Sequence, residues 1–199
     1  MKLFKFIFPV FFMVFLFLSN HHAHASPVQD QLKTSIDKML EILRDPSLKG
    51  EEQVEKRRAS LRKVIDERFS FAKMSQLSLG RHWKKRSDEE KKIFIDLFGQ
   101  LLEETYISKL EAYTDEKVVY VKEYIKKKKA QINTKIITET IEIPIDYRMY
   151  NTKDGAWLVY DLVIEGVSLV GNYRSQFDQM LQKDSYEKLV EDLKKKVDN

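Results

Sequence analysis

Few residues of this chain have the types and spacing that catalytic chemistry requires. There is no cysteine, and His82 is the one histidine of four that lies beyond residue 25. This composition disfavours zinc and copper sites and leaves a Ser-His-Asp centre one candidate base. Asp161, Asp146 or His82 could serve a small-molecule isomerase or hydrolase as a single buried base. No acid–base pair converges at a readable spacing, so we expect no catalytic site, no metal and no cofactor.

Two groups of basic residues could instead contact a phosphate or an anionic surface. Arg174 is a candidate for binding the phosphate of a ligand's head group, and the alternative is a structural ion pair with Asp161, Glu165 or Asp178. The run Lys126–Lys129 is a candidate for transient contact with a membrane surface, and the alternative is a solvated turn. The membrane interpretation predicts docking that weakens as salt is added.

The stretch from Trp157 to Phe177 organises the rest of the sequence. Residues 157–164 are apolar or aromatic at nearly every position on both faces, which is typical of a strand covered on both sides. Gly166 then allows backbone angles that are closed to other residues, so the chain can turn sharply before a helix begins at Asn172. These elements would form one wall and one corner of a cavity.

The first 25 residues have the features of a secretion signal. Lys2 and Lys5 precede an almost purely apolar run over residues 6–18, and Ala23-His24-Ala25 has the small-x-small pattern of a cleavage site. The apolar run is shorter than the roughly 20 residues that cross a bilayer. We therefore expect residues 1–25 to be a cleavable signal peptide that exports the protein, the alternative being a retained anchor.

The remaining residues 26–199 are enough for one domain with a sizeable core and no disulfide bonds. Loss of Lys2 and Lys5 lowers the formal net charge of +4 by two. The balance of charge is then nearly even, which argues against a nucleic-acid partner.

The first half of this domain has helical periodicity. Residues 27–43 and 50–69 place apolar side chains three and four apart, and we expect a helix over each. Residues 69–83, rich in aromatic residues and methionine, would form an inward-facing connector with a turn at Gly80. Residues 87–90 form a capping box, which predicts the start of a long helix with a broad apolar band. Such a band packs on two sides or lines a cavity.

Beyond the long helix the period changes to two. Residues 118–125, 131–138, 141–150 and 157–164 have the pattern of strands, and their short connections predict an antiparallel meander. Pro144 lacks a backbone donor, so we expect the third strand to be an edge or to be bulged there.

Two further helices are expected over residues 169–181 and 186–197. The fold class is therefore α+β, with helices over residues 26–113, a sheet over 117–166 and C-terminal helices over 169–197. We expect a curved four-stranded antiparallel sheet packed against several helices, with an apolar cavity between them.

Three stretches together resemble the MlaC, or toluene-tolerance, family. They are LSLGRHW at 77–83, FxxxFxxLLxxTY at 94–106 and, most specifically, DLxIEGVSLVxNYRxxF at 161–177. The resemblance covers about residues 28–197. It implies a periplasmic soluble lipid carrier, not an enzyme, whose apolar pocket binds the acyl tails of a phospholipid. It also implies two partners: an outer-membrane lipoprotein complex and an inner-membrane ABC lipid transporter.

Other functions remain open beside this one. A sister branch of the same family is associated with hopanoids, so the lipid is less certain than the carrier role. The enzyme already considered is a second alternative, and a protein-binding adaptor, which would purify without lipid, is a third.

A pocket for acyl chains needs adaptable apolar side chains with a few polar tips at its mouth. Regular alternation along residues 157–164 would let either Trp157 and Val159 or Leu158 and Leu162 face the lipid, but not both pairs. The candidate lipid-binding residues are Met74, Phe94, Phe98, Leu101, Tyr106, Val119, Ile143, Ile145, Tyr147, Trp157, Val159, Leu162, Val167, Leu169, Tyr173 and Phe177.

Overall fold

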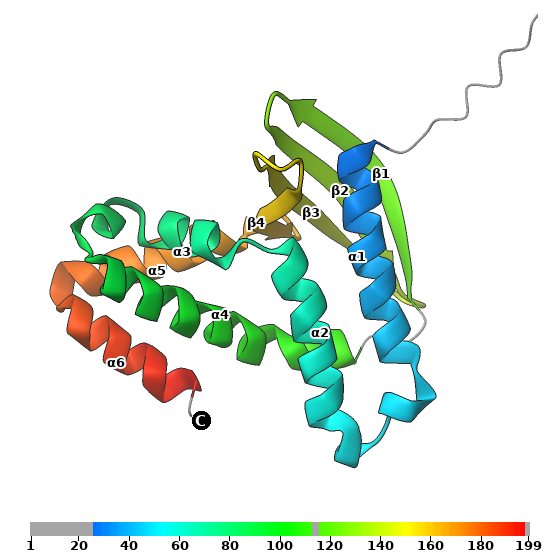
Figure 1. The fold of residues 1–199 in the computed structure, drawn as a ribbon, viewed down its shortest axis with the longest axis horizontal. Coiled ribbons are helices and arrows are strands. Elements are labelled where there is room, and N and C mark those ends of the chain that lie inside the picture. Colours follow the sequence, from blue (N-terminus) through cyan, green and yellow to red (C-terminus); the bar gives the residue numbers. More distant parts are fainter. Residues whose placement is uncertain (1–25, 113–115, 198–199) are drawn as a thin grey trace, which may run out of the picture.

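A computed structural model describes residues 26–112 and 116–197 (Figure 1). The expected signal peptide lies outside these residues. The α-helices are α1 (Pro27–Arg44), α2 (Val54–Arg68), α3 (Phe71–Leu79), α4 (Asp88–Glu111), α5 (Leu169–Lys183) and α6 (Tyr186–Val197). Short 3₁₀ helices are η1 (Pro46–Leu48), η2 (Glu51–Gln53) and η3 (Gly80–Lys85). The strands are β1 (Lys117–Lys126), β2 (Lys129–Ile137), β3 (Glu142–Asn151), β4 (Trp157–Ile164) and β5 (Val167–Ser168).

The strands form one antiparallel sheet in the order β1-β2-β3-β4-β5. The predicted α+β class and meander are confirmed, and β5 is a short addition to the four expected strands. Its two residues are too few to show alternation in the sequence. The turn before it consists of Glu165 and Gly166, whose φ angles are 50° and 83°. Two positive φ angles are typical of a type I′ hairpin turn, which folds β5 back onto the end of β4.

Pro144 lies just beyond the last residue of β3 that pairs with β4, so β3 is an edge on that side there, which is one of the two predicted arrangements. The irregular pairing of β3 with β4 occurs at Arg148 and Met149 instead. The carbonyl of Pro144 accepts a hydrogen bond of 3.0 Å from the backbone N–H of Glu165. Because N and O of a strand residue point to the same side, the nitrogen of Pro144 faces the turn where β4 has ended. No donor is required at that position.

Helix α4 begins as predicted and is buried on two sides. The Ser87 hydroxyl accepts from the backbone N–H of Glu90, and the Glu90 carboxylate accepts from that of Ser87. The helix packs against α3 and α6. No helix in the described part of the chain is long and apolar enough to cross a membrane.

The predicted connector over residues 69–83 is instead helix α3 followed by η3. The Ser70 hydroxyl caps the start of α3 by accepting from the backbone N–H of Lys73 at 3.3 Å. Gly80, with φ of 54°, ends it. A helix of nine residues is too short for spacings of three and four to stand out in a sequence so rich in apolar residues.

Two large apolar clusters fill the spaces between these elements. The helical cluster lies among α3, α4, α5 and α6 and includes Phe94, Phe98 and Phe177. The sheet cluster lies between α1 and the sheet and includes Met149 and Val159. In Figure 1, α1 crosses one face of the curved sheet while α3 to α6 form a separate helical layer beside it. The two clusters therefore belong to different layers that meet along one boundary.

Candidate functional site

The two apolar clusters meet at Phe69 and Leu162, which we call the seam. Each of these side chains is half-buried and packs against both clusters. Phe69 ends α2 and forms a parallel bridge with Val159 of β4. The next residue, Ser70, donates its backbone N–H to the carbonyl of Val159 at 2.8 Å. Backbone hydrogen bonding thus fixes the seam at the junction of α2, α3 and β4.

The sheet presents incompletely covered apolar residues next to the seam. Ile143, Ile145, Tyr147 and Met149 alternate along β3 and share the face that carries the sheet cluster. Met149, at the end covered by α1, is fully buried, whereas the other three are half-buried. The apolar face therefore extends beyond the area that α1 covers.

The opposite face of the sheet is polar, so the two faces of the sheet are clearly distinguished. The Asp146 carboxylate accepts hydrogen bonds from the side-chain amides of Gln131 and Asn133. Lys135 pairs with Glu142 at 2.6 Å on the same face. An apolar ligand would consequently bind on the side of the helices.

Two tyrosines contribute polar tips from the helical layer. Tyr106 of α4 and Tyr173 of α5 are half-buried and pack against the helical cluster. Burial, together with the nearby Tyr173 hydroxyl, raises the pKa of Tyr106. The Tyr173 ring lies edge-on to Phe98, with 5.1 Å between centroids. Both phenols can donate hydrogen bonds at the border of an apolar site.

A bulge in β4 interrupts the regular alternation on which the choice between the two residue pairs was based. Val159 is opposite Met149 and Asp161 is opposite Arg148, so Tyr160 has no partner of its own on β3. Trp157 and Val159 belong to the sheet cluster, and Leu162 packs against that same cluster. The extra residue shifts the alternation, so all three side chains lie on one face.

The predicted lipid-binding residues occupy different environments. Two of them are set apart from the rest: Val119 lies opposite Lys135, on the polar face, and Val167 in β5 is 60% exposed. Six others are half-buried: Tyr106, Ile143, Ile145, Tyr147, Leu162 and Tyr173. Residues buried within the clusters are Met74, Phe94, Phe98, Leu101, Trp157, Val159, Leu169 and Phe177.

Phe69 is the seam residue that the predicted site omitted. The sequence placed it at the end of a helix, on the border of the aromatic run over residues 69–83. The run signalled an apolar environment, but nothing in it indicated the bridge between Phe69 and Val159. Contacts between residues this far apart in the sequence depend on the packing of α2 against β4.

Arg174 is exposed and secures one helix to another. Its Nε donates to the carbonyl of Leu77, in the last turn of α3, at 2.6 Å. The stem of the side chain passes Gly80, where an added Cβ would lie 3.6 Å from the Arg174 Cδ. Among the described residues Arg174 forms no ion pair with Asp161, Glu165 or Asp178. Asp161 pairs with Arg148, and Asp178 pairs with Arg81. A cation near carbonyls left without partners at a helix end is a stabilising arrangement.

Asp161 has a structural environment rather than that of a free base. It is 4% exposed and accepts from Arg148 at 2.9 Å, from the Ser168 hydroxyl at 2.7 Å and from the Val170 backbone at 3.0 Å. The last two donors lie at the start of α5, where a carboxylate is favourable. Asp161 therefore connects β3 and β4 to α5.

The other candidate bases lie elsewhere. His82 is 2.8 Å from Asp178, on the helical layer, and Asp146 belongs to the polar face of the sheet. No group of three metal-binding side chains occurs among residues 26–112 and 116–197. Among the described residues, the three candidate bases therefore do not converge on one site.

Two hollows lie on the surface away from the seam. One, of about 570 Å³, is lined by residues of α1 and η1, including Asp37 and Arg44. The other, of about 510 Å³, lies along α2 and is lined by charged residues such as Arg62 and Glu67. Both hollows are lined by charged side chains, so neither is suited to acyl chains.

Comparison with known proteins points to one family. The sequence matches the family described as MlaC protein over residues 33–195. It is 30% identical over 118 residues to the intermembrane phospholipid transport system binding protein MlaC of Haemophilus influenzae. That alignment spans 56% of this chain and 55% of the relative, so little more than half of each protein is compared.

The fold is similar to that of a phospholipid-binding protein from Ralstonia solanacearum, solved in complex with a phospholipid. The TM-score is 0.79 and the sequence identity is 25%. The similarity covers 86% of this chain and 97% of the other. Both relatives are named for binding or transport of phospholipid, and neither is named as an enzyme.

Proposed function

The chain belongs to the MlaC protein family, and from that premise we propose that it is a soluble lipid carrier without enzymatic activity. It holds the acyl chains of a phospholipid between its two apolar clusters. The similarity to a fold solved with a phospholipid, over 97% of that chain, is the observation that carries the proposal.

The proposed binding site opens at the seam. Phe69 and Leu162 are the contacts that join the two clusters, so their separation would expose apolar surface of both layers. The half-buried face of β3 around Ile145 and Tyr147 would continue this surface on the sheet. Tyr106 and Tyr173 would lie at the border, where ester or phosphate oxygens could accept hydrogen bonds.

The energetics of an acyl chain explain why such a site must be large and adaptable. Each buried methylene contributes about 0.8 kcal/mol, so about thirty methylenes amount to on the order of 20 kcal/mol. A carrier has to cover most of that surface and still release the lipid. Few fixed polar contacts and a boundary that can separate satisfy both demands.

Residues 1–25 are proposed to export the protein to the periplasm, where they would be cleaved. There the carrier would exchange lipid with an outer-membrane lipoprotein complex and an inner-membrane ABC transporter. The name of the Haemophilus influenzae relative, an intermembrane phospholipid transport system binding protein, supports this placement. Pull-down with each complex, in the lipid-loaded and the lipid-free state, tests the two partners.

Extraction of the protein purified from its host cells, followed by mass spectrometry, tests the function directly. We expect about one phospholipid for each chain. Triterpenoids in place of phospholipid would assign the protein to hopanoid transport instead. Protein that carries no lipid, and binds none when mixed with phospholipid vesicles, would contradict the proposal and favour an adaptor.

A further inference from the structure

The β1–β2 turn concentrates positive charge at one end of the sheet. Lys126–Lys129 form the end of β1, the turn and the start of β2, and all four side chains are exposed. The backbone N–H of Asn151 donates to the carbonyl of Lys128 at 2.9 Å, which brings the β3–β4 turn and its exposed Lys153 alongside. We call Lys126–Lys129 and Lys153 the basic tip.

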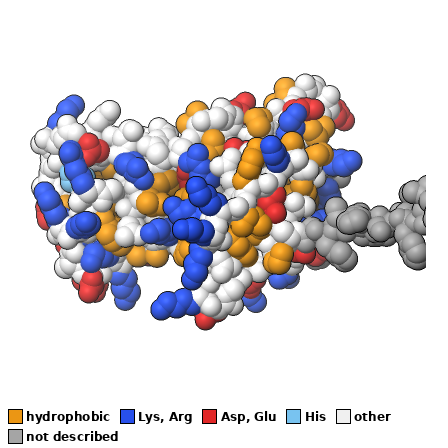
Figure 2. Space-filling model, turned by 90° about the horizontal axis from the view of Figure 1, so that it is seen from above, with side chains coloured by type: hydrophobic (Ala, Val, Ile, Leu, Met, Phe, Trp, Pro, Cys, Tyr) orange, Lys and Arg blue, Asp and Glu red, His pale blue; other side chains and the backbone are white. Residues whose placement is uncertain are grey.

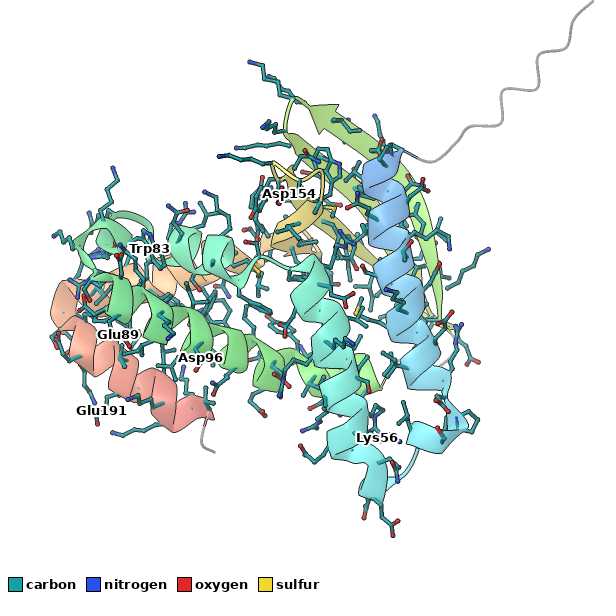
Figure 3. The ribbon with its side chains drawn as sticks, in the orientation of Figure 1. Lys56, Trp83, Glu89, Asp96, Asp154 and Glu191 are labelled. Carbon is teal, nitrogen blue, oxygen red and sulfur yellow. The ribbon has the colours of Figure 1, made fainter. Side chains whose placement is uncertain are left out.

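The charge of the basic tip is not neutralised by neighbours. None of its five lysines forms an ion pair with another described residue, whereas Lys135, on β2, pairs with Glu142. The nearest acidic side chain along the β3–β4 turn is Asp154 (Figure 3). Figure 2 shows the molecule of Figure 1 from above, and lysine and arginine side chains gather in the middle of that view.

Exposed apolar residues accompany the basic tip. Tyr124 and Ile125, at the end of β1, are 51% and 50% exposed. The ammonium group of Lys122 lies 4.6 Å from the centroid of the Tyr124 ring. Lysines beside an aromatic and an aliphatic side chain are typical of segments that lie in the interface of a membrane.

The turn places a lysine at a backbone position that is unfavourable for it. Lys127 has a φ of 56°, a conformation that glycine or asparagine adopts more readily than lysine. A lysine at this position keeps the basic run unbroken at the expense of an easier turn. Strain of this kind is often found where a side chain has a function.

We propose that the basic tip docks the protein on the surface of a bilayer that contains anionic phospholipids. The lysines would bind the head groups while Tyr124 and Ile125 enter the interface. The tip lies at the opposite end of the sheet from Ile143, so docking would hold the protein near the bilayer without covering that end of the apolar face. Only the purpose of the docking rests on the proposed carrier function.

Cosedimentation of the purified protein with vesicles tests the docking. We expect binding to phosphatidylethanolamine vesicles that contain phosphatidylglycerol, little binding to phosphatidylcholine vesicles, and weaker binding as salt is added. Lys128→Glu with Lys129→Glu should weaken binding by about tenfold or more, since each lysine contributes about a factor of five near an anionic surface. Lys84→Glu with Lys85→Glu, which changes the same charge on η3, is the matched control and should have little effect.

Three results would overturn the proposal: equal binding to both kinds of vesicle, unchanged binding of the tip variant, or an equal loss in the control. A second variant, Ile125→Ser, should weaken binding less and in a manner independent of salt. Circular dichroism confirms that each variant is folded. The docking is measured with lipid-free protein and the carrier function by extraction, so failure of one leaves the other result intact.

Discussion

Val159 and Leu162 are separated by two residues of β4, yet their side chains lie on the same face of the sheet. A regular strand would place them on opposite faces. The unpaired Tyr160 between them forms a bulge, which brings both onto the sheet cluster. Val159 lies within the cluster, fully buried, whereas Leu162 reaches the boundary with the helical cluster. Substitution of the two residues should therefore have different consequences.

Leu162→Trp should reduce lipid binding while leaving a folded protein. A larger ring at the boundary between the clusters occupies space that acyl chains would take, and the half-buried position tolerates added volume. We expect several-fold less phospholipid in the extracted protein, measured by mass spectrometry, with an unchanged far-UV circular dichroism spectrum. Normal lipid content in this variant would rule out the seam as the binding site.

Two variants of the same strand serve as controls. Leu158→Trp adds equal volume and should retain the lipid, because residue 158 pairs with Tyr150 on the face away from the sheet cluster. Val159→Trp should instead destabilise the fold by about 1–3 kcal/mol, because the site is already filled. Urea unfolding distinguishes this loss of stability from a specific loss of lipid.

The turn between β4 and β5 offers a test of backbone strain. Glu165 has a φ of 50° and Gly166 one of 83°. Asparagine adopts such angles more readily than glutamate, so Glu165→Asn should raise the stability by about 0.5–1 kcal/mol. Gly166→Ala should lower it by about 1–2 kcal/mol for the same reason. The free energy of unfolding in urea measures both, and opposite signs would show that the type I′ conformation is not required.

Features that depend on residues close together in the sequence were predicted correctly, whereas features that depend on contacts between distant residues were not. The capping box of Ser87 and Glu90 and the strand over residues 157–164 are local patterns, and both are confirmed. The bulge at Tyr160 and the bridge between Phe69 and Val159 depend on which elements pack together. Those two features determine which side chains reach the seam, so the fold was predictable while the details of the site were not.

Glu111 connects the end of α4 to the start of α2 and should make the protein sensitive to acid. It accepts from Arg57 at 2.9 Å and from Arg58 at 3.0 Å. Burial opposes its charge, but the hydrogen bonds from Arg58 and Arg57 outweigh that effect and hold the pKa of Glu111 below its usual value of 4.5. The stabilisation is therefore present above pH 4.5 and is lost as the pH falls further.

Glu111→Gln provides the test. At neutral pH the variant should be less stable than the wild type by about 1 kcal/mol, since the two arginines lose their charged partner. The difference should shrink in urea unfolding experiments below about pH 4.5, where the carboxylate becomes protonated first in the unfolded chain and, at lower pH, in the folded protein. A difference that stays constant with pH would show that the arginines do not act through the charge of Glu111.

Tyr186 should have the opposite pH dependence. Its hydroxyl donates to the backbone carbonyl of Glu90 at 2.9 Å, in the first turn of α4, and burial raises its pKa to about 12. Because the folded state keeps the phenol neutral, its contribution is complete below the ordinary pKa of 10 and is lost as the pH rises toward 12. Tyr186→Phe lacks the hydrogen bond and should be about 1 kcal/mol less stable at neutral pH. Urea unfolding should show this difference disappearing above pH 10, and a difference that persisted there would mean that the hydroxyl is not shielded from ionisation.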